Sequence, residues 1–153
     1  MATEQVSATE LGQLYLELHH RLHRQVDEAM TAAGLSMSRT KVLMVLDEHG
    51  PMHQAALAAR LGFAPRSVTD TVDALEREGL ARRRADPNDR RAWLVEVSPD
   101  GLTALGRALG VKKKAMDQIF GALDAPTRAE FAAVLISMRN RLTSTVGEEA
   151  HVQ

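Results

Sequence analysis

The fold is decided by the stretch QAALAARLGFAPRSVTDTVDALEREG at residues 54–79 and by LARRRADPNDRRAWLVEVSPDG, which follows it at residues 80–101. The first stretch holds two apolar runs at helical spacing, which predict helices at about 53–61 and 65–78 joined by about three residues around Gly62. The second stretch changes to the period of a strand and predicts a β-hairpin. A close helical pair followed by a β-hairpin indicates a winged helix-turn-helix.

The helical pair carries the residue types that close packing needs. Ala58 is small enough to let the two helices approach, Gly62 supplies the tight turn, and the β-branched Val68 holds the second helix against the first. In the hairpin, we expect strands at about 80–84 and 92–97, separated by a polar, turn-rich tip. The spacing of Ala58, Gly62 and Val68 is weak evidence alone for a helix-turn-helix, and the arginine-rich hairpin that follows makes the evidence much stronger.

Outside this region the spacing of apolar residues predicts helices. Leucines at three- and four-residue steps predict a long first helix at 8–33, and a second helix follows from Ser36, a suitable N-cap, to about Glu48. Ser98 and Pro99 begin a long fifth helix, and a break at residues 124–126 precedes a sixth. The sixth helix carries an apolar side that we expect to face inward, formed by Phe131, Val134, Leu135, Met138 and Leu142.

The predicted fold class is therefore mainly α, with a winged helix-turn-helix region at 36–98. We interpret the helices at 8–33 and 99–147, far from that region, as dimerisation helices. No internal repeat or linker divides the 153 residues, a length that fits one domain with a real core.

The second helix of the pair exposes a polar face that could read DNA. At about 100° per residue, Arg66, Asp70, Asp73 and Arg77 lie opposite its apolar side. The same pattern fits a solvated face with ion pairs Arg66–Asp70 and Asp73–Arg77. Recognition helices contact base edges mainly through their N-terminal residues, which here are Pro65, Arg66, Ser67, Thr69 and Asp70.

Composition narrows the function classes. The chain has no cysteine, which excludes disulfides, thiolate metal sites and cysteine nucleophiles. Its N-terminus lacks a signal-peptide run, and no apolar stretch is long enough to span a membrane, so we expect a cytoplasmic protein with no membrane partner. The net charge is −1, but residues 60–91 carry eight basic and six acidic side chains, with five arginines within ten residues. Such basic clusters are typical of proteins that meet phosphates.

The chain resembles the MarR (multiple antibiotic resistance regulator) family. The wing signature matches in DPxDRR at 86–91, VxV at 95–97 and SxxG at 98–101. Upstream, AxLAxxxG at 55–62 and VTxxVxxLExxGL at 68–80 match the family's helix-turn-helix. The resemblance covers roughly residues 8–145 and implies a homodimer with two winged lobes, binding a pseudo-palindromic operator.

The resemblance also implies roles in the wing. An arginine at the wing tip enters the minor groove and a neighbouring aspartate steadies it, roles that fall on Arg91 and Asp89; a narrow minor groove attracts an inserted guanidinium. Arg90 could contact phosphate, and Arg82 to Arg84 could follow the DNA backbone or pair with acids. Asp70 departs from the basic or neutral residue that relatives often carry. The DNA-binding residues predicted in the wing are Arg82, Arg84, Asp89, Arg90 and Arg91.

Two further sites are weighed. The resemblance implies release of DNA by an anionic aromatic or phenolic ligand, with candidate lining residues Tyr15, His19, Met37, Arg39 and Met44 by position alone. A metal-responsive regulator is an alternative, because His19 and His23 are four residues apart on one helix face, but a zinc site needs three or four ligands. We therefore predict no metal site and no cofactor.

The function predicted is sequence-specific binding of double-stranded DNA by a homodimeric transcription regulator, with repression as the commoner mode in the family. An enzyme is not expected, because glycine-rich phosphate loops, nucleophile elbows and His-Glu-x-x-His are all missing from the sequence. A winged helix used purely as a protein-interaction module is the remaining alternative, since a fold does not fix a function.

Overall fold

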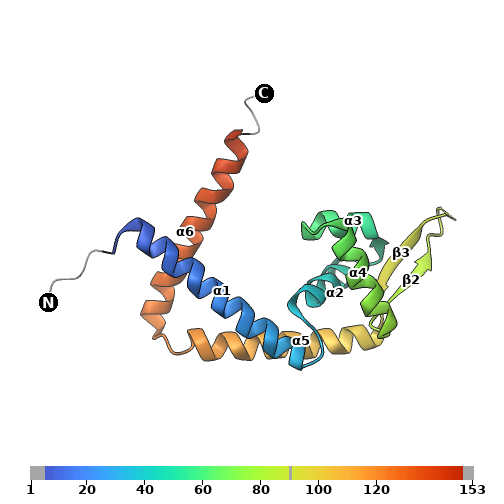
Figure 1. The fold of residues 1–153 in the computed structure, drawn as a ribbon, viewed down its shortest axis with the longest axis horizontal. Coiled ribbons are helices and arrows are strands. Elements are labelled where there is room, and N and C mark those ends of the chain that lie inside the picture. The colour runs from blue at the N-terminus through green and yellow to red at the C-terminus, as the bar shows by residue number, and fades with distance from the viewer. Residues whose placement is uncertain (1–5, 90, 150–153) are drawn as a thin grey trace. The chain divides into compact units, whose positions relative to one another are not determined.

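The computed structural model describes residues 6–89 and 91–149, with side chains to residue 142. The chain divides into two compact units, Met1–Ala115 and Met116–Gln153. The elements, in chain order, are α1 (Ala8–Ala32), α2 (Met37–His49), β1 (Met52–His53), α3 (Gln54–Leu61), α4 (Pro65–Arg77), β2 (Ala81–Ala85), β3 (Trp93–Val97), α5 (Pro99–Phe120) and α6 (Ala125–Glu149) (Figure 1). This mainly helical order confirms the predicted fold class.

The core of the first unit is built by the helical pair and the elements around it. Leu57 on α3 and Val68, Val72 and Leu75 on α4 are all fully buried, as their helical spacing predicts. Val42, Leu43 and Leu46 of α2 and Val26 and Met30 near the end of α1 are buried as well. Burial of this apolar surface is what fixes the helix pair in place.

The helix pair has the expected connection. Gly62 adopts the left-handed conformation with φ +65°, and the backbone N–H of Phe63 donates to the carbonyl of Ala58, 3.2 Å away. Pro65 then occupies the first turn of α4, where its missing N–H costs nothing. This short turn places the N-terminal end of α4 directly after α3 in the chain.

The hairpin belongs to a three-stranded antiparallel sheet in the order β1–β3–β2. The long pairing runs from Ala81 opposite Val97 to Ala85 opposite Trp93. The two-residue strand β1 adds to the other edge, with Met52 opposite Val95 and His53 opposite Leu94. The sequence did not predict β1, because two residues are too short to show a strand period.

The base of the hairpin is anchored to α5. The Ser98 hydroxyl donates to the carbonyl of Gly79 at 2.6 Å and accepts from the backbone N–H of Gly101 at 3.0 Å. A Cβ on Gly101 would lie 2.0 Å from the carbonyl oxygen of Leu80, so only glycine permits this approach. The SxxG motif therefore joins the hairpin to the start of α5.

The apolar sides of the outer helices are exposed, which corrects one expectation. On α1, Leu11, Leu14 and Leu18 are each about half exposed, at 56%, 57% and 49%. On α6, Val134 and Met138, expected to face inward, are 53% and 45% exposed. The error arises because periodicity identifies an apolar face but not which chain covers it. No helix in the described part of the chain is long and apolar enough to cross a membrane.

Candidate nucleic-acid interface

The outer face of α4 is exposed, as predicted. Arg66, Ser67 and Asp70 lie on the solvent side of the helix, opposite the buried Val68 and Val72. The ion pairs Arg66–Asp70 and Asp73–Arg77, which the alternative of a solvated face would carry, do not form among the described residues. Asp73 is paired instead with Arg83 of β2. Arg66 therefore has a guanidinium that no carboxylate holds within the part of the chain that the structure describes.

Thr69 is less available than its neighbours. Its hydroxyl donates to the carbonyl of Pro65 at 3.0 Å and accepts from the side-chain amide of Gln54 on α3. Both contacts are made inside the helix pair. The structure thus gives Thr69 a role in holding α3 against α4, in addition to its place beside Arg66.

Arg83 joins the wing to both helices of the pair. Its guanidinium donates to Glu76 at 2.5 Å, to Asp73 at 2.6 Å and to the side-chain oxygen of Gln54 at 3.1 Å. Its backbone N–H also donates to Glu76, at 3.1 Å. The Arg83 side chain is only 25% exposed. Its positive charge offsets one of the two negative charges that Asp73 and Glu76 place on α4 and that would otherwise repel phosphate.

Arg82 and Arg84 share one carboxylate on the opposite strand. Their Nε atoms lie 2.5 Å and 2.9 Å from the two oxygens of Glu96. The hydrogen bond from Arg82, with that from Arg84, holds the pKa of Glu96 below its ordinary value, so Glu96 is ionised at neutral pH. One negative charge against two positive ones leaves a net charge of about +1 on this strand surface, so these predicted DNA contacts are partly neutralised.

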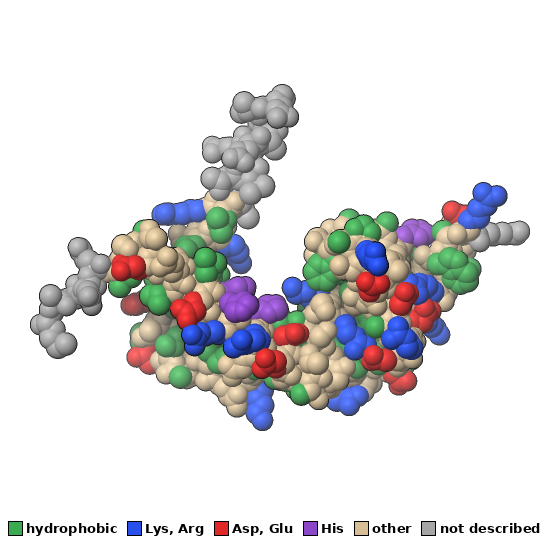
Figure 2. All heavy atoms as spheres, viewed as in Figure 1, with side chains coloured by type: hydrophobic (Ala, Val, Ile, Leu, Met, Phe, Trp, Pro, Cys, Tyr) green, Lys and Arg blue, Asp and Glu red, His purple; other side chains and the backbone are tan. Residues whose placement is uncertain are grey.

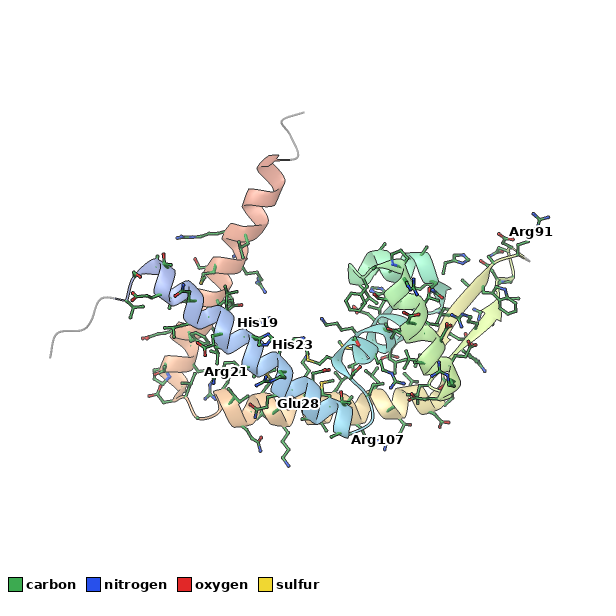
Figure 3. The ribbon with its side chains drawn as sticks, viewed as in Figure 1. His19, Arg21, His23, Glu28, Arg91 and Arg107 are labelled. Carbon is green, nitrogen blue, oxygen red and sulfur yellow. The ribbon has the colours of Figure 1, made fainter. Side chains whose placement is uncertain are left out.

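The tip of the hairpin presents its arginine differently. Arg91 lies at the far end of the hairpin (Figure 3). It is exposed, and no ion pair holds its guanidinium among the described residues. Asp89 accepts a hydrogen bond from the backbone N–H of Arg91, at 2.9 Å, rather than from its guanidinium. The carboxylate therefore fixes the turn and leaves the charge free. Arg90 lies outside the described residues.

The arginines of the lobe thus fall into two groups. Arg82, Arg83 and Arg84 are committed to carboxylates, as is Arg39, whereas Arg60, Arg66, Arg77 and Arg91 make no ion pair in the described ranges. Of these four, Arg66 and Arg91 lie at the N-terminal end of α4 and at the hairpin tip. Positive and negative side chains interleave over the lobe, and the hairpin tip ends in a basic side chain (Figure 2). Asp73 and Glu76 were not predicted from the sequence as the partners of Arg83. The signal that could have indicated them is their spacing, because residues three apart lie on the same face of a helix.

The candidate ligand-lining residues lie on two helices of the first unit. Tyr15 and His19 stack on α1 with ring centroids 6.2 Å apart, and His19 is followed along the same helix by His23 (Figure 3). Met37, Arg39 and Met44 belong to α2. The Arg39 guanidinium lies 2.5 Å from the carboxylate of Glu78, which directly follows α4, so it already has an anionic partner.

The histidines of α1 are candidate ligands for a metal ion. His19 and His23 follow each other on α1, with ring centroids 6.1 Å apart. No group of three or more histidine, aspartate or glutamate side chains placed to hold a metal ion occurs among the residues that the structure describes. The geometry therefore adds no third ligand to the histidine pair.

Known proteins resemble this lobe in sequence. The MarR family's sequence profile matches residues 35–93. Two bacterial relatives are similar over most of their length. YwhA, an uncharacterised HTH-type transcriptional regulator of Bacillus subtilis, is 24% identical over 75% of this chain and 83% of its own. The transcriptional repressor MprA of Escherichia coli K12 is 22% identical over 86% of this chain and 76% of its own.

Solved structures share the fold. The YusO protein of Bacillus subtilis has a TM-score of 0.75 and 25% identity, covering 88% of this chain and 98% of its own. A mutant form of MarR from E. coli, solved in complex with operator DNA, has a TM-score of 0.69 and 20% identity, covering 84% of this chain and 92% of its own. The fold of this chain is thus one that these solved proteins share.

Proposed function

We propose that the chain is a winged-helix transcription regulator of the MarR family, whose sequence profile matches residues 35–93, and that it binds double-stranded DNA as a homodimer. In this proposal α4 lies in the major groove and the β2–β3 wing at the adjacent minor groove. The observation that carries this proposal is the selective pairing of arginines in the lobe. Internal carboxylates hold Arg82, Arg83 and Arg84, whereas Arg66 and Arg91 project from the two elements that a winged helix presents to DNA.

Arg66 and Arg91, which make no ion pair among the described residues, suit different parts of the duplex. Arg66, in the first turn of α4, is placed for a base edge or phosphate, because recognition helices read bases with their N-terminal residues. Pro65, Ser67, Thr69 and Asp70 form the rest of that end of the helix. Arg91 at the hairpin tip suits the negative potential of a narrow minor groove. Arg82, Arg84 and Arg90 are proposed as supporting phosphate contacts, and Asp89 as the residue that shapes the turn.

Dimerisation is proposed from the exposed apolar helix faces. Leu11, Leu14 and Leu18 on α1, and Val134 and Met138 on α6, are about half exposed in a single chain. Contiguous apolar surface on a protein is typical of an interface. A second copy of the chain is the partner that supplies matching faces, and two-fold symmetry would then match a pseudo-palindromic operator. Residues 8–33 and 99–147 are accordingly proposed as the dimerisation helices around the lobe at 36–98.

We propose repression, released by a small aromatic acid or phenol, as the regulatory mode. The relative MprA is named a transcriptional repressor. The chain has no cysteine, so thiol oxidation cannot be its trigger. The effector would bind near Tyr15, His19, Met37, Arg39 and Met44 and act only through its differential affinity for the DNA-competent and DNA-incompetent states.

The proposal is tested by mapping the binding sites of the protein across its own genome and measuring its affinity for a recovered site and a scrambled duplex over a range of salt. We expect two half-sites about one helical turn apart and binding that weakens steeply with salt. Binding to neither duplex at any salt would contradict the proposal and favour a protein-interaction module. Aromatic acids and phenols added to the complex then test the effector.

A further inference from the structure

His53 occupies a position whose local role it does not perform. It precedes α3 as the N-cap residue, yet its side chain makes no capping hydrogen bond. Serine, threonine, aspartate and asparagine are the residues that cap a helix well. His53 lies in β1, at the opposite edge of the sheet from β2. Its ring contacts Asp86 and the carbonyl of Trp93, which lie where the wing strands meet the wing tip. Its contacts therefore belong to the wing rather than to the helix.

Both ring nitrogens of His53 face acceptors. Nε2 lies 3.0 Å from a carboxylate oxygen of Asp86, and Nδ1 lies 3.3 Å from the backbone carbonyl oxygen of Trp93. A neutral imidazole has one N–H and can donate to only one of these groups, whereas an imidazolium donates to both. The two acceptors together therefore match the two donors of an imidazolium, whereas a neutral ring leaves one of them without its hydrogen bond.

Asp86 links this contact to the tip. The residue is only 9% exposed. Its second carboxylate oxygen accepts from the backbone N–H of Asn88 at 2.8 Å, and its own N–H donates to the carbonyl of Ala92 at 3.0 Å. Asp86 thus closes the loop that carries Arg91. A change in how His53 holds this carboxylate is transmitted directly to the backbone of the tip.

The other charged groups around β1 are already committed. On β3, Glu96 is held by Arg82 and Arg84. On α3, Arg60 lies beside His49, 3.5 Å from its Nε2. Gln54, next to His53 in the chain, is neutral and bound to Thr69 and Arg83. Asp86 is therefore the carboxylate that contacts the His53 ring among the described residues.

We propose that His53 is a positioning residue of the wing, and that its imidazolium form holds Asp86 and the Trp93 carbonyl in the geometry that presents Arg91 to DNA. The inference rests on the proposed DNA-binding function. Since the competent geometry then binds one proton more per wing, affinity for DNA rises as the pH falls from 8 to 6, the range over which histidine titrates. The expected gain is roughly twofold to tenfold, the value of one hydrogen bond.

The test compares the full-length wild type with His53→Gln and His49→Gln. Affinity for an A·T-rich 40-base-pair duplex is measured at pH 8, 7 and 6 at constant salt. Glutamine keeps one donor for Asp86 but cannot gain a proton, so His53→Gln should lose the pH-dependent gain. His49 is exposed in the same lobe and makes no contact with the wing among those the structure describes, so His49→Gln should retain it. The remaining histidines are common to all three proteins.

A second readout separates this inference from the proposed function. Trp93 is the single tryptophan, so its fluorescence reports the wing without DNA. Emission should change between pH 8 and 6 in the wild type and in His49→Gln, but not in His53→Gln. If His53→Gln matches the wild type in both pH profiles, the inference is overturned while the proposed function stands. If no protein binds duplex, the proposed function fails, and the emission profiles still decide whether His53 protonation is coupled to the wing.

Discussion

The winged lobe and α6 both carry apolar residues at helical spacing, but their surroundings differ. On α4, Val68, Val72 and Leu75 are completely buried within the chain. On α6, no described side chain is buried, and Val134 and Met138 are about half exposed. The lobe is therefore a structure that its own chain completes, whereas α6 exposes apolar side chains that the proposed dimer would cover. Contacts within one chain should therefore determine the stability of the lobe. Contacts between chains should determine the stability of the assembly that α6 forms.

The largest effect is expected from charges on the α6 face. Val134→Glu with Met138→Glu would place two carboxylates in the proposed dimer interface, at a cost on the order of 3–5 kcal/mol. Sedimentation should show a monomer at concentrations where the wild type is dimeric. Ala133→Glu, on the opposite side of α6, is the matched control and should stay dimeric. A double variant that sediments like the wild type would remove α6 from the interface.

A core truncation in the lobe should behave in the opposite way. Leu75→Ala removes a fully buried side chain and should lower the free energy of unfolding by about 2–5 kcal/mol. Thermal or denaturant unfolding of the variant should show this loss. Unlike the α6 variant, Leu75→Ala should remain dimeric at the protein concentrations at which the folded wild type is dimeric. A variant that is fully folded but monomeric would show that the two regions are not separable.

The ion-pair network of the lobe predicts a smaller, graded effect. Arg83→Gln removes the partner of Asp73 and Glu76 and should cost about 1–2 kcal/mol of stability, since the carboxylates are partly screened by solvent. It should also weaken DNA binding, because the net charge of this cluster falls from −1 to −2. Arg82→Gln is the control, with a 67% exposed side chain and an expected stability loss of about 0.5 kcal/mol or less. Equal losses in the two variants would contradict the role given to the Arg83 network.

The contrast between the regions also explains what could be predicted from sequence. Helix bounds, the turn at Gly62 and the Ser36 and Ser98 caps follow from local chemistry, so they were predictable to within a few residues. The exposure of Leu14 and Val134 was not, because periodicity does not name the partner.

In the candidate interface, local sequence predicted the exposed face of α4 and the exposed tip arginine. It could not predict the partners of Arg83 or His53, because those contacts join residues from 7 to 40 positions apart through the tertiary fold. The resemblance assigned Asp89 to steady the Arg91 side chain, whereas the structure shows a hydrogen bond to the Arg91 backbone. Asp89 therefore holds the turn that carries the arginine rather than its guanidinium.

The central claim is that Arg91 at the wing tip, which makes no ion pair among the described residues, is a DNA contact, whereas Arg83, held by Asp73 and Glu76, is structural. The most direct measurement is the salt dependence of duplex binding for wild type, Arg91→Ala and Arg107→Ala, the last removing an exposed arginine of α5 far along the chain from the wing. The account predicts that Arg91→Ala binds operator and A·T-rich duplex more weakly, with a salt slope lower by about one unit per wing in contact, while Arg107→Ala matches the wild type. Unchanged affinity and slope in Arg91→Ala would contradict it.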